Sequence, residues 1–403
     1  MAHKGIRKHF LNPRPAAGEN SSVDYAYGPL SIEDILPFLQ STADTHTSPL
    51  QGKPENFVVI IGNVGARWIV PASSHHCRQI LSSWRPYDLA SRIKWQVVEV
   101  ISFFSLLRYL PDTLCFKFSA DQLSENLLKL GLVGNFTPVI QVGNPSPTRK
   151  MTLFLLQGSS ARAVIKIPLT KAAVAAVAAE ATTLQAMSRL QPTIPQSVHY
   201  DSASGWSVQN WVQGSPSSRK FTEQHRDFLL QLVAPESSTS LKTALEKNTL
   251  IHDALFLPTA DKRKLEAAME RLTDSSILPR TIVHGDFTPW NIKVTKGKLR
   301  IFDWESARLD SLPLIDICNF FYRQDYLFQE KRKFPHYLLE HDQVIRYLDA
   351  LSISRSTALH LALYYLVDAY CRHLSNGEDA TYHYDLLQID AVEKEIQALE
   401  NRA

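Results

Sequence analysis

Two short stretches of β-type sequence interrupt the otherwise helical second half of this chain. They read "RTIVHGDFTPWNI" and "KLRIFDWES", and only "VTKGK" lies between them. Such a short connection predicts a hairpin-like return, which brings Asp286, Asn291 and Asp303 close together at the strand ends. Carboxylate and amide oxygens are the protein ligands that Mg²⁺ prefers, with phosphate oxygens completing its shell. The pattern therefore indicates a site that handles phosphate.

The same residues also have simpler explanations. Isolated Asp and Asn residues near turns mostly serve as turn residues and caps, so Asp286 and Asn291 have this alternative. His284 is better explained as a structural histidine than as a general base. Trp290 and Trp304 are better explained as core residues than as platforms for a substrate.

The segment before these motifs predicts a small antiparallel sheet followed by a helix. Three strand patterns begin near residue 137, "TPVIQVG", "KMTLFLLQ" and "ARAVIKIP", and turn-rich sequence separates them. The alanine-rich stretch after them predicts a helix over 169–190. "WSVQNWVQGSPSS" then reads as a strand that runs into a linker. Further helices are expected at 221–233, 241–255, 260–274 and from 312 onward.

A lysine inside one of these apolar strands carries the next inference. Lys166 lies in "AVIKIP", and a lysine in a buried strand is costly unless a carboxylate pairs with it. The helix that follows offers Glu180 as its natural partner. Such a pair would hold the ammonium group over the phosphates of a nucleotide. The alternative is a surface lysine on an edge strand.

Length and composition set broad limits. With 403 residues, of which 44% are hydrophobic, the chain can bury a sizeable core and hold two or three domains. A net charge of +3, spread along the chain, gives no support for a nucleic-acid partner. The four cysteines lie far apart, so neither a zinc site nor a disulfide framework is indicated, and a reducing cytoplasm is the expected location.

The N-terminal third shows no recognisable chemistry. Residues 1–22 read as a flexible basic arm, and "FVVIIGNVGARWIV" (57–70) predicts a hairpin within an N-terminal module that spans 23–132. The most apolar run, "WQVVEVISFFSLLRYL" (95–110), is interrupted by Glu99 and Arg108. It is shorter than the roughly 20 residues of a spanning helix, which favours a buried or interface helix over a membrane contact.

The ordered set "VIKIP", "EATTLQAM", "HGDFTPWN" and "IFDWE" resembles the aminoglycoside phosphotransferase and choline kinase group of protein-kinase-like enzymes. The resemblance covers about residues 137 to 400, and the catalytic-loop spacing is similar to H-x-D-x-x-x-x-N. It implies an α+β fold with a small antiparallel-sheet lobe and a large helical lobe, preceded by an extra N-terminal α/β module. The nucleotide-binding lobe and its linker strand would span 133–214, and the helical lobe with the acceptor site 215–403.

The resemblance also implies roles for individual residues. Asp286 would orient the acceptor hydroxyl and take its proton, and Asn291 and Asp303 would hold Mg²⁺. Lys166, oriented by Glu180, would bind phosphates of ATP, with GTP left open. The stretch from Gln209 to Gly214, including Trp211, would meet the base. His284 would support the catalytic loop, and Asp316 is interpreted as a helix-capping support.

The sequence departs from the protein-kinase pattern at several points. Instead of a glycine-rich loop it has "GNPSPTRK", where Ser146, Thr148, Arg149 or Lys150 would have to cover the phosphates. Thr288 stands where many protein kinases have a lysine, the metal strand continues as Asp-Trp-Glu, and there is no Ala-Pro-Glu segment. These differences favour a small-molecule acceptor over a protein.

Two rival functions remain open at this point. The chain could be a catalytically silent, kinase-shaped binding module, or it could be a protein kinase. The acceptor itself is not fixed by the sequence, and neither is the oligomeric state. An excess of acidic residues after Trp304 would suit a cationic acceptor, although solvated helix faces are the better explanation. Several tyrosines could form a cation-π box or belong to the core, namely Tyr322, Tyr326, Tyr364, Tyr365 and Tyr370.

Overall fold

The computed structural model describes most of the chain from residue 25 onward. The described ranges are 25–39, 55–62, 65–73, 77–84, 86–87, 89–109, 113–118, 121–190, 192–254, 262–272, 276–328, 334–375 and 379–401. The predicted basic arm, residues 1–22, lies outside them.

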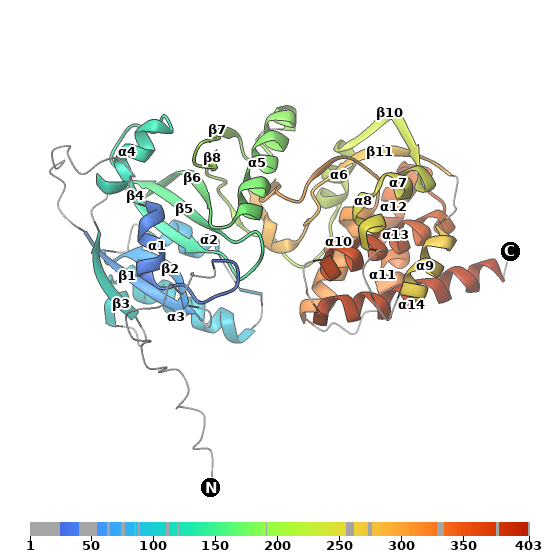
Figure 1. Ribbon diagram of the computed structural model, residues 1–403, viewed down its shortest axis with the longest axis horizontal. Coiled ribbons are helices and arrows are strands. Elements are labelled where there is room, and N and C mark those ends of the chain that lie inside the picture. The colour runs from blue at the N-terminus through green and yellow to red at the C-terminus, as the bar shows by residue number, and fades with distance from the viewer. Residues whose placement is uncertain are drawn as a thin grey trace, which may run out of the picture.

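Two lobes make up the described chain, one built on a sheet and one built from helices (Figure 1). This arrangement confirms the predicted two-lobed α+β fold. The sheet of the first lobe has eight strands in the order β3-β1-β2-β4-β5-β6-β8-β7, and every neighbouring pair is antiparallel. Its strands are β1 (Glu55–Gly62), β2 (Gly65–Pro71), β3 (Thr113–Phe118), β4 (Thr137–Val142), β5 (Lys150–Gln157), β6 (Ser160–Pro168), β7 (Ser197–Asp201) and β8 (Trp206–Asn210).

The N-terminal strands belong to the same sheet as the predicted nucleotide-binding strands. The predicted 57–70 hairpin is confirmed as β1 and β2, and the predicted meander is confirmed as β4, β5 and β6. Strand β2 pairs with β4 through Trp68 and Ile69, so no break in the sheet marks the predicted boundary near residue 132. The N-terminal third therefore widens the lobe that carries Lys166.

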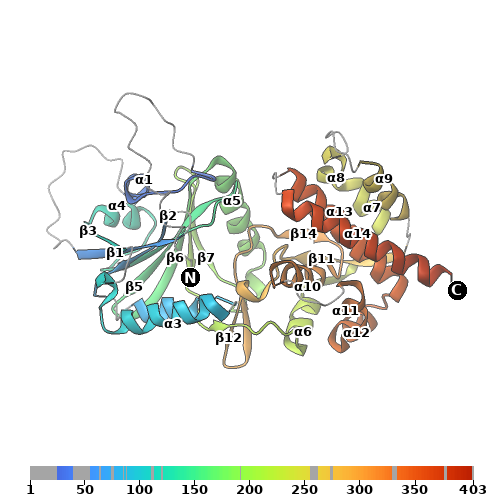
Figure 2. The same ribbon diagram turned by 90° about the horizontal axis from the view of Figure 1, so that it is seen from below.

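Helices from the N-terminal third cover both faces of this sheet (Figure 2). Helices α1 (Ile32–Leu39) and α4 (Asp121–Lys129) pack on one face, whose apolar cluster includes Ile35, Leu123 and Ile165. Helices α2 (Arg78–Ser83) and α3 (Leu89–Phe103) pack on the other, where Trp68 and Trp95 form a second cluster. The second face is the one that continues toward the helical lobe.

Helix α3 contains most of the apolar run noted in the sequence. Trp95 is buried against the sheet, whereas Val97, Val100 and Phe104 are about half exposed or more. The short helix η2 (Leu107–Tyr109) follows. Within the residues that the structure describes, no helix is both long and apolar enough to span a membrane.

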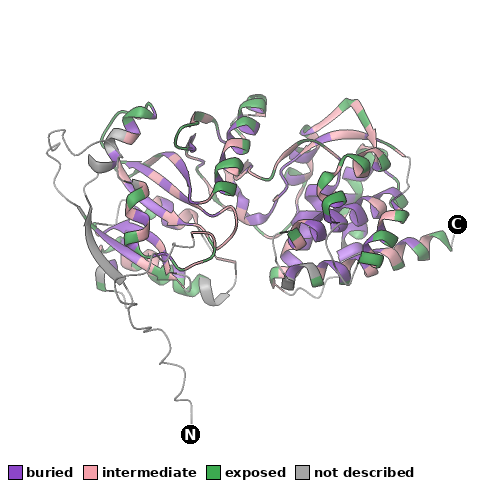
Figure 3. Cartoon of the chain, viewed as in Figure 1, coloured by how far each residue is buried: buried purple, intermediate pink, exposed green. Residues whose placement is uncertain are grey.

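The helical lobe is built around α13, most of whose residues are buried (Figure 3). Its helices are α6 (Glu223–Gln231), α7 (Leu241–Lys247), α8 (Thr249–Ala254), α9 (Lys262–Arg271), α10 (Ile315–Phe328), α11 (Phe334–Glu340), α12 (Asp342–Ala350), α13 (Arg355–Ser375) and α14 (Asp379–Glu400). Tyr322, Tyr364, Tyr365 and Tyr370 are buried in this core, as the simpler interpretation of these tyrosines expected. Helix α5 (Lys171–Ala186) and the turn η3 (Ser188–Leu190) lead from the sheet toward this lobe, and the predicted 169–190 helix is thereby confirmed.

Two details of the helical lobe differ from the prediction. The expected helix over 241–255 breaks at Asn248, whose backbone is extended and whose side-chain amide donates to Tyr364 and Asp368. Strands β10 (Val233–Ser240) and β14 (Arg308–Ser311) also occur in stretches between the expected helices, where no strand was predicted. Both strands pair with β11 (Ile277–Val283), because that β-rich stretch needs hydrogen-bonding neighbours on both edges.

A second small sheet carries the predicted hairpin at the junction of the lobes. Strand β12 (Ile292–Thr295) pairs with β13 (Lys298–Ile301), which confirms the hairpin-like return. On its other edge β12 pairs with β9 (Ser215–Pro216), the end of the linker from the sheet lobe. The polar residues before β12 and after β13 therefore lie where the two lobes meet.

Candidate active site

The loop after β11 contains a glycine, Gly285, at a position where a side chain would clash with the neighbouring backbone. Gly285 has φ +80, and a Cβ there would lie 2.1 Å from the carbonyl oxygen of Ser306. A side chain at this position would meet both a backbone clash and an unfavourable left-handed conformation. Gly285 thus lets the loop pack closely against the segment after β13. This packing holds the backbone from which the Asp286 side chain extends.

Buried polar groups hold this loop from behind. The Asp316 carboxylate accepts from the backbone N–H of His284 at 2.7 Å and of Gly285 at 3.0 Å. Asn319 donates to the Gly285 carbonyl at 2.8 Å. Burial raises the pKa of Asp316 above its ordinary value, although the two N–H donors oppose that shift. Asp316 thus supports the loop from the first turn of α10, and its role as a helix cap stays a prediction.

His284 connects the two motifs. Its Nδ1 accepts from the backbone N–H of Asp286 at 3.2 Å, and its Nε2 lies 2.9 Å from the Phe302 carbonyl. Because Nδ1 accepts, the ring proton is on Nε2, which donates to Phe302. The ring also lies 4.5 Å from that of Trp304, which is fully buried. This geometry makes His284 a brace between the loop and the Asp303 segment.

Asp286 and Asn291 meet directly across the turn η4 (Pro289–Asn291). The Asn291 amide nitrogen donates to the Asp286 carboxylate at 2.8 Å and to the Asp286 carbonyl at 3.0 Å. Since the nitrogen is used in this way, the amide oxygen is the atom of Asn291 that remains for a cation. The spacing of five residues thus places one carboxylate and one amide side by side.

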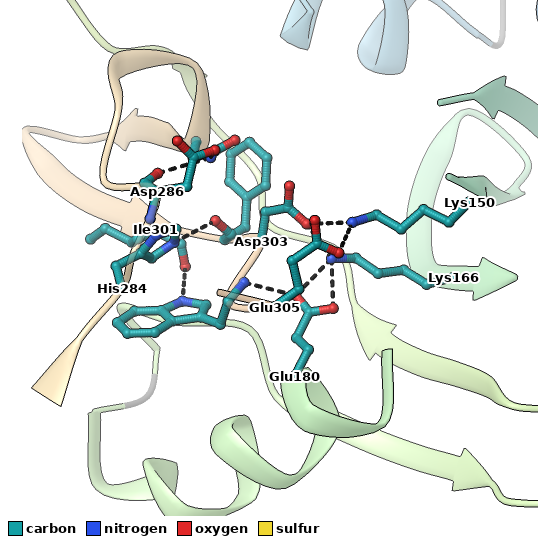
Figure 4. A network of polar contacts seen from close by, with 11 residues as sticks. Lys150, Lys166, Glu180, His284, Asp286, Ile301, Asp303 and Glu305 are labelled. Carbon is teal, nitrogen blue, oxygen red and sulfur yellow. Dashed lines mark hydrogen bonds and ion pairs between the residues drawn. The ribbon is translucent and has the colours of Figure 1, made fainter. Parts of the chain in front are cut away.

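Lys166 and Glu180 form the ion pair that the sequence suggested (Figure 4). Lys166 Nζ lies 2.6 Å from the Glu180 carboxylate, and Glu180 also accepts from the Trp304 backbone N–H at 3.0 Å. The same ammonium lies 2.6 Å from Asp303 Oδ1. The pair therefore links the sheet, α5 and the segment after β13 in one buried network.

A second lysine enters this network. Lys150 Nζ lies 3.1 Å from Asp303 Oδ1 and also pairs with Glu305. Burial opposes the charged form of Lys150, but the carboxylates of Asp303 and Glu305 raise its pKa above the ordinary value. Burial likewise acts against charged Asp303, yet Lys150 and Lys166 hold the pKa of this carboxyl far below its usual range. Glu305 was not anticipated, and its pKa is raised by burial and by neighbouring Asp303.

The donor set fits a hard cation that also has phosphate ligands. Asp303 has φ 70, a conformation that Asp tolerates better than most residues and that is common at functional sites. Its carboxylate and the Asn291 amide oxygen are ligands suited to Mg²⁺. Within the described ranges, no three His, Cys, Asp or Glu side chains are grouped to hold a metal by themselves. Such a cation would need further oxygens from a nucleotide.

A cavity of about 700 Å³ joins these groups between the lobes. We call it the interlobe cavity; its lining includes Lys150, Lys166, Asp286, Asn291 and Asp303. Of the proposed phosphate-covering residues, Lys150 lines it, whereas Ser146, Thr148 and Arg149 do not. Arg149 is buried and donates to the carbonyls of Gly143 and Gly28, so it braces the turn. Trp290 lines the cavity, whereas Trp304 belongs to the core of the helical lobe.

The linker between the lobes forms another wall of the interlobe cavity. Gln209 Nε2 and Trp211 Nε1 are buried donors that have no hydrogen-bond partner among the residues the structure describes. Lys293 Nζ donates to the Val212 carbonyl at 3.0 Å and lies 3.8 Å from the centre of the Trp211 ring. Burial lowers the pKa of Lys293 to about 7. Unpaired buried donors are costly unless a ligand satisfies them, which points to this wall as a binding surface.

Tyr87, from the N-terminal third, also lines the cavity and was missed by sequence reasoning. Its hydroxyl lies 2.7 Å from the Pro289 carbonyl and 3.0 Å from the Ser217 carbonyl, and it donates its single proton to one of them at a time. Its ring makes an edge contact with Trp290. No local signal in the sequence reveals this contact, because the two segments lie about 200 residues apart.

Comparisons with known proteins found one family match and a number of similar solved structures. Residues 151–325 match the sequence model of a family described as the phosphotransferase enzyme family, and no curated protein matches the chain. Among solved structures, the choline kinase LicA from Streptococcus pneumoniae has 13% identity and a TM-score of 0.46, covering 68% of this chain and 98% of that one. A thermostable mutant of aminoglycoside phosphotransferase APH(4)-Ia, with ADP and hygromycin B, has 15% identity and a TM-score of 0.44, covering 67% and 96%.

The matched segment contains every residue of the network in Figure 4 except Lys150, which precedes it by one position. The predicted resemblance, expected over about 137 to 400, is confirmed for this shorter stretch. The family match covers residues 151–325, less than half of the chain, so it shows a resemblance of this segment to the phosphotransferase enzyme family.

Proposed function

We propose that this protein is a phosphotransferase that transfers the γ-phosphoryl group of ATP to a hydroxyl of a small molecule, with Mg²⁺ as cofactor. One observation carries the proposal. Lys166 pairs with Glu180 and also contacts Asp303, and both Lys166 and Asp303 line the interlobe cavity together with Asp286. Two lysines for phosphate oxygens, oxygen ligands for a cation and a carboxylate for a hydroxyl proton are the parts that phosphoryl transfer needs.

Each group has a separate task in this proposal. Lys166 binds phosphate oxygens and is oriented by Glu180, while Lys150 takes the place that a glycine-rich loop would have. Gln209 and Trp211 offer their donors to the base. Asn291 and Asp303 would hold Mg²⁺, which when bound neutralises charge on the phosphates.

The reaction itself is a displacement at phosphorus. The acceptor hydroxyl oxygen forms a bond to the γ-phosphorus, and the bond from that phosphorus to the bridging oxygen breaks, so that ADP leaves. Asp286 orients the hydroxyl and accepts its proton. Most of the rate enhancement would come from positioning and from charge neutralisation by the two lysines.

Nucleotide consumption by the purified full chain tests the proposal. The assay contains Mg²⁺ and a panel of amino sugars, amino-alcohols, neutral sugars, sugar acids and sugar phosphates. Wild type should consume ATP in the presence of at least one acceptor class. Asp286→Asn should lower turnover by about 10²- to 10⁴-fold, the usual contribution of a general base, while ATP affinity stays nearly unchanged.

Asp390→Asn serves as the matched control, because Asp390 is a partly exposed aspartate that pairs with Lys264 and lies outside the interlobe cavity. Equal turnover of wild type and Asp286→Asn would remove Asp286 from the mechanism. ATP binding without consumption on any acceptor would instead favour a catalytically silent module.

A further inference from the structure

A second cavity, of about 460 Å³, lies in the helical lobe and has an unusual charge pattern. Four cationic side chains line it, from Lys247, Arg280, Arg308 and Arg372, against two carboxylates, from Asp310 and Asp368. We call it the arginine pocket. Its size matches sites for small molecules, which commonly range over roughly 300–1,000 Å³. Because its cationic side chains outnumber its carboxylates, the arginine pocket has a positive formal charge, whereas the C-terminal part of the chain is acidic as a whole.

A single buried carboxylate organises two of the arginines. Arg308 Nη1 lies 3.2 Å from Asp368 Oδ1, Arg372 pairs with Oδ2, and Asn248 donates to Oδ1 at 2.8 Å. Asp368 is only 2% exposed, whereas the side chains of the two arginines are about one-third exposed. One negative charge thus holds two guanidinium groups, and each keeps N–H donors for another anion.

The remaining cations are only weakly compensated. Arg280 pairs with Asp310, whose side chain is 56% exposed, and exposed ion pairs contribute little. Lys247 has no ion-pair partner among the residues that the structure describes. A site with fixed arginines and surplus positive charge is suited to an oxyanion, because the planar guanidinium matches carboxylate and phosphate geometry.

The arginine pocket lies beside the catalytic loop. Its lining includes Ser306, whose carbonyl packs so closely on Gly285 that only glycine fits there, one residue before Asp286. Asp286 is also near enough to act on Arg372: burial lowers the pKa of Arg372, but Asp368, and to a smaller degree Asp286, raise it above its ordinary value. The pocket therefore borders the loop that carries the proposed proton acceptor, and Asp286 itself lines the interlobe cavity on the same loop.

We infer that the arginine pocket binds an oxyanion group of the acceptor, a carboxylate or a phosphate, and so presents a hydroxyl of the same molecule to Asp286. The inference rests on the proposed function and narrows its acceptor to a small hydroxylated anion. This anionic acceptor has the opposite charge to the cationic acceptor that the acidic composition of the C-terminal part would suit.

Binding measurements on the full chain test the inference without relying on turnover. Calorimetric titration uses four matched probes: glucose, glucosamine, glucuronate and glucose 6-phosphate. At least one of the two anionic probes should bind, and its affinity should fall as NaCl is raised; comparing the two distinguishes carboxylate from phosphate. Glucose and glucosamine should bind at least tenfold more weakly.

The variant Arg280→Gln combined with Lys247→Gln should weaken the anionic probe about tenfold or more, since hydrogen bonds to charged groups contribute about 1.5–3 kcal/mol. These two positions are chosen because truncating Arg308 or Arg372 would leave buried Asp368 undercompensated and could unfold the chain. Arg271→Gln is the matched control, because Arg271 is also a partly exposed arginine in an ion pair, with Glu393 at 3.5 Å, and lies outside both cavities.

The outcomes separate the inference from the proposed function. Anion binding that the double variant loses and the control keeps would support the pocket, even if no acceptor is phosphorylated and the proposed function fails. Turnover of glucose or glucosamine, without binding of either anion, would overturn the inference and leave the proposed function standing. Equal loss of anion binding in the double variant and the control would also overturn it.

Discussion

The interlobe cavity and the arginine pocket lie on two sides of one loop, yet they use charge in different ways. The interlobe cavity pairs its lysines with three acidic groups, and a wall of aromatic and amide side chains faces them. The arginine pocket has more cations than carboxylates among its lining residues. The first arrangement suits a nucleotide that arrives with a cation, because Asp303 can exchange its lysine partners for a metal–phosphate unit. The second suits an anion that arrives without one.

This difference teaches how one loop can border both a nucleotide site and a site for an anionic group. Asp286 lines the interlobe cavity, while its neighbour Gly285 packs on Ser306 of the arginine pocket. The loop is held rigidly from behind by Asp316 and Asn319, so neither ligand needs to reorder it. Preorganisation of this kind lowers the cost of bringing two reactants together.

The largest expected difference between the two sites follows from Asp303→Asn. Loss of this carboxylate should weaken binding of Mg²⁺–ATP about 10- to 100-fold, since charge-assisted contacts contribute about 1.5–3 kcal/mol. Lys166 and Lys150 keep Glu180 and Glu305 as partners, so the fold should survive. Calorimetry with Mg²⁺–ATP and with an anionic sugar measures both sites. A comparable loss at the arginine pocket would show that the two sites are not independent.

The cations of the two sites should also differ in how they respond to pH. Burial lowers the pKa of Lys293 from its ordinary 10.5 to about 7, whereas a guanidinium group in general keeps its charge over the pH range of proteins. Between about pH 7 and pH 10.5, Lys293 is protonated in the unfolded chain but deprotonated in the folded chain. The contribution of Lys293 to the free energy of unfolding therefore rises with pH over this range. Below about pH 7 both states are protonated and the cost of burying the charge is fully present. The slope cannot exceed about 1.4 kcal/mol per pH unit for one group.

Denaturant unfolding of wild type and Lys293→Met from pH 6 to 9 measures this contribution. The difference in unfolding free energy should shift in favour of wild type as pH rises above 7. Parallel curves over the whole range would contradict the assignment of a titrating cation to the linker wall.

Tyr87→Phe should affect the interlobe cavity alone. The variant keeps the ring against Trp290 but removes the hydroxyl contact with the Pro289 and Ser217 carbonyls. A neutral hydrogen bond contributes about 1 kcal/mol, so kcat/KM for ATP should fall about fivefold. Steady-state kinetics with ATP varied give this value. No change would mean that the N-terminal third shapes the lobe without positioning the catalytic loop.

The smallest expected change is a gain at the arginine pocket. Asp310→Asn removes an exposed negative charge beside Arg280, so affinity for an anionic sugar should rise about two- to threefold at low salt, the effect of a surface charge. Titration in about 20 to 200 mM NaCl checks this affinity gain, because screening of surface charges becomes strong over roughly this range of salt concentration. Weaker binding in this variant would argue against an anionic occupant.

Local pattern was enough to predict the network of buried groups within the matched segment. Lys166 stood out because a strand lysine needs a partner, and Asp286, Asn291 and Asp303 stood out because their strands are joined by one short turn. Glu305 could have been found on the same grounds, since it lies two residues after Asp303. Lys150 was only one of four candidates for covering the phosphates, because the sequence could not show which side chain in that turn faces the cavity.

The remaining features depend on contacts between distant parts of the chain. Tyr87 reaches the catalytic loop from the N-terminal third, and the arginine pocket combines residues from α7, β11, β14 and α13. Helical spacing identifies which side of α13 is buried, but it does not reveal that Asp368 will hold two arginines. The functional division of 23–132, 133–214 and 215–403 stays a prediction, since one sheet runs through the first boundary.

Transfer of label from γ-labelled ATP to a small acceptor tests the central claim most directly. The full chain is incubated with Mg²⁺ and the acceptor panel, and the products are separated from the protein and from inorganic phosphate. The account predicts a labelled phosphate ester of an acceptor with wild type, and its loss with Asp286→Asn. Label found only on protein or in inorganic phosphate, or the same ester yield from both proteins, would contradict it.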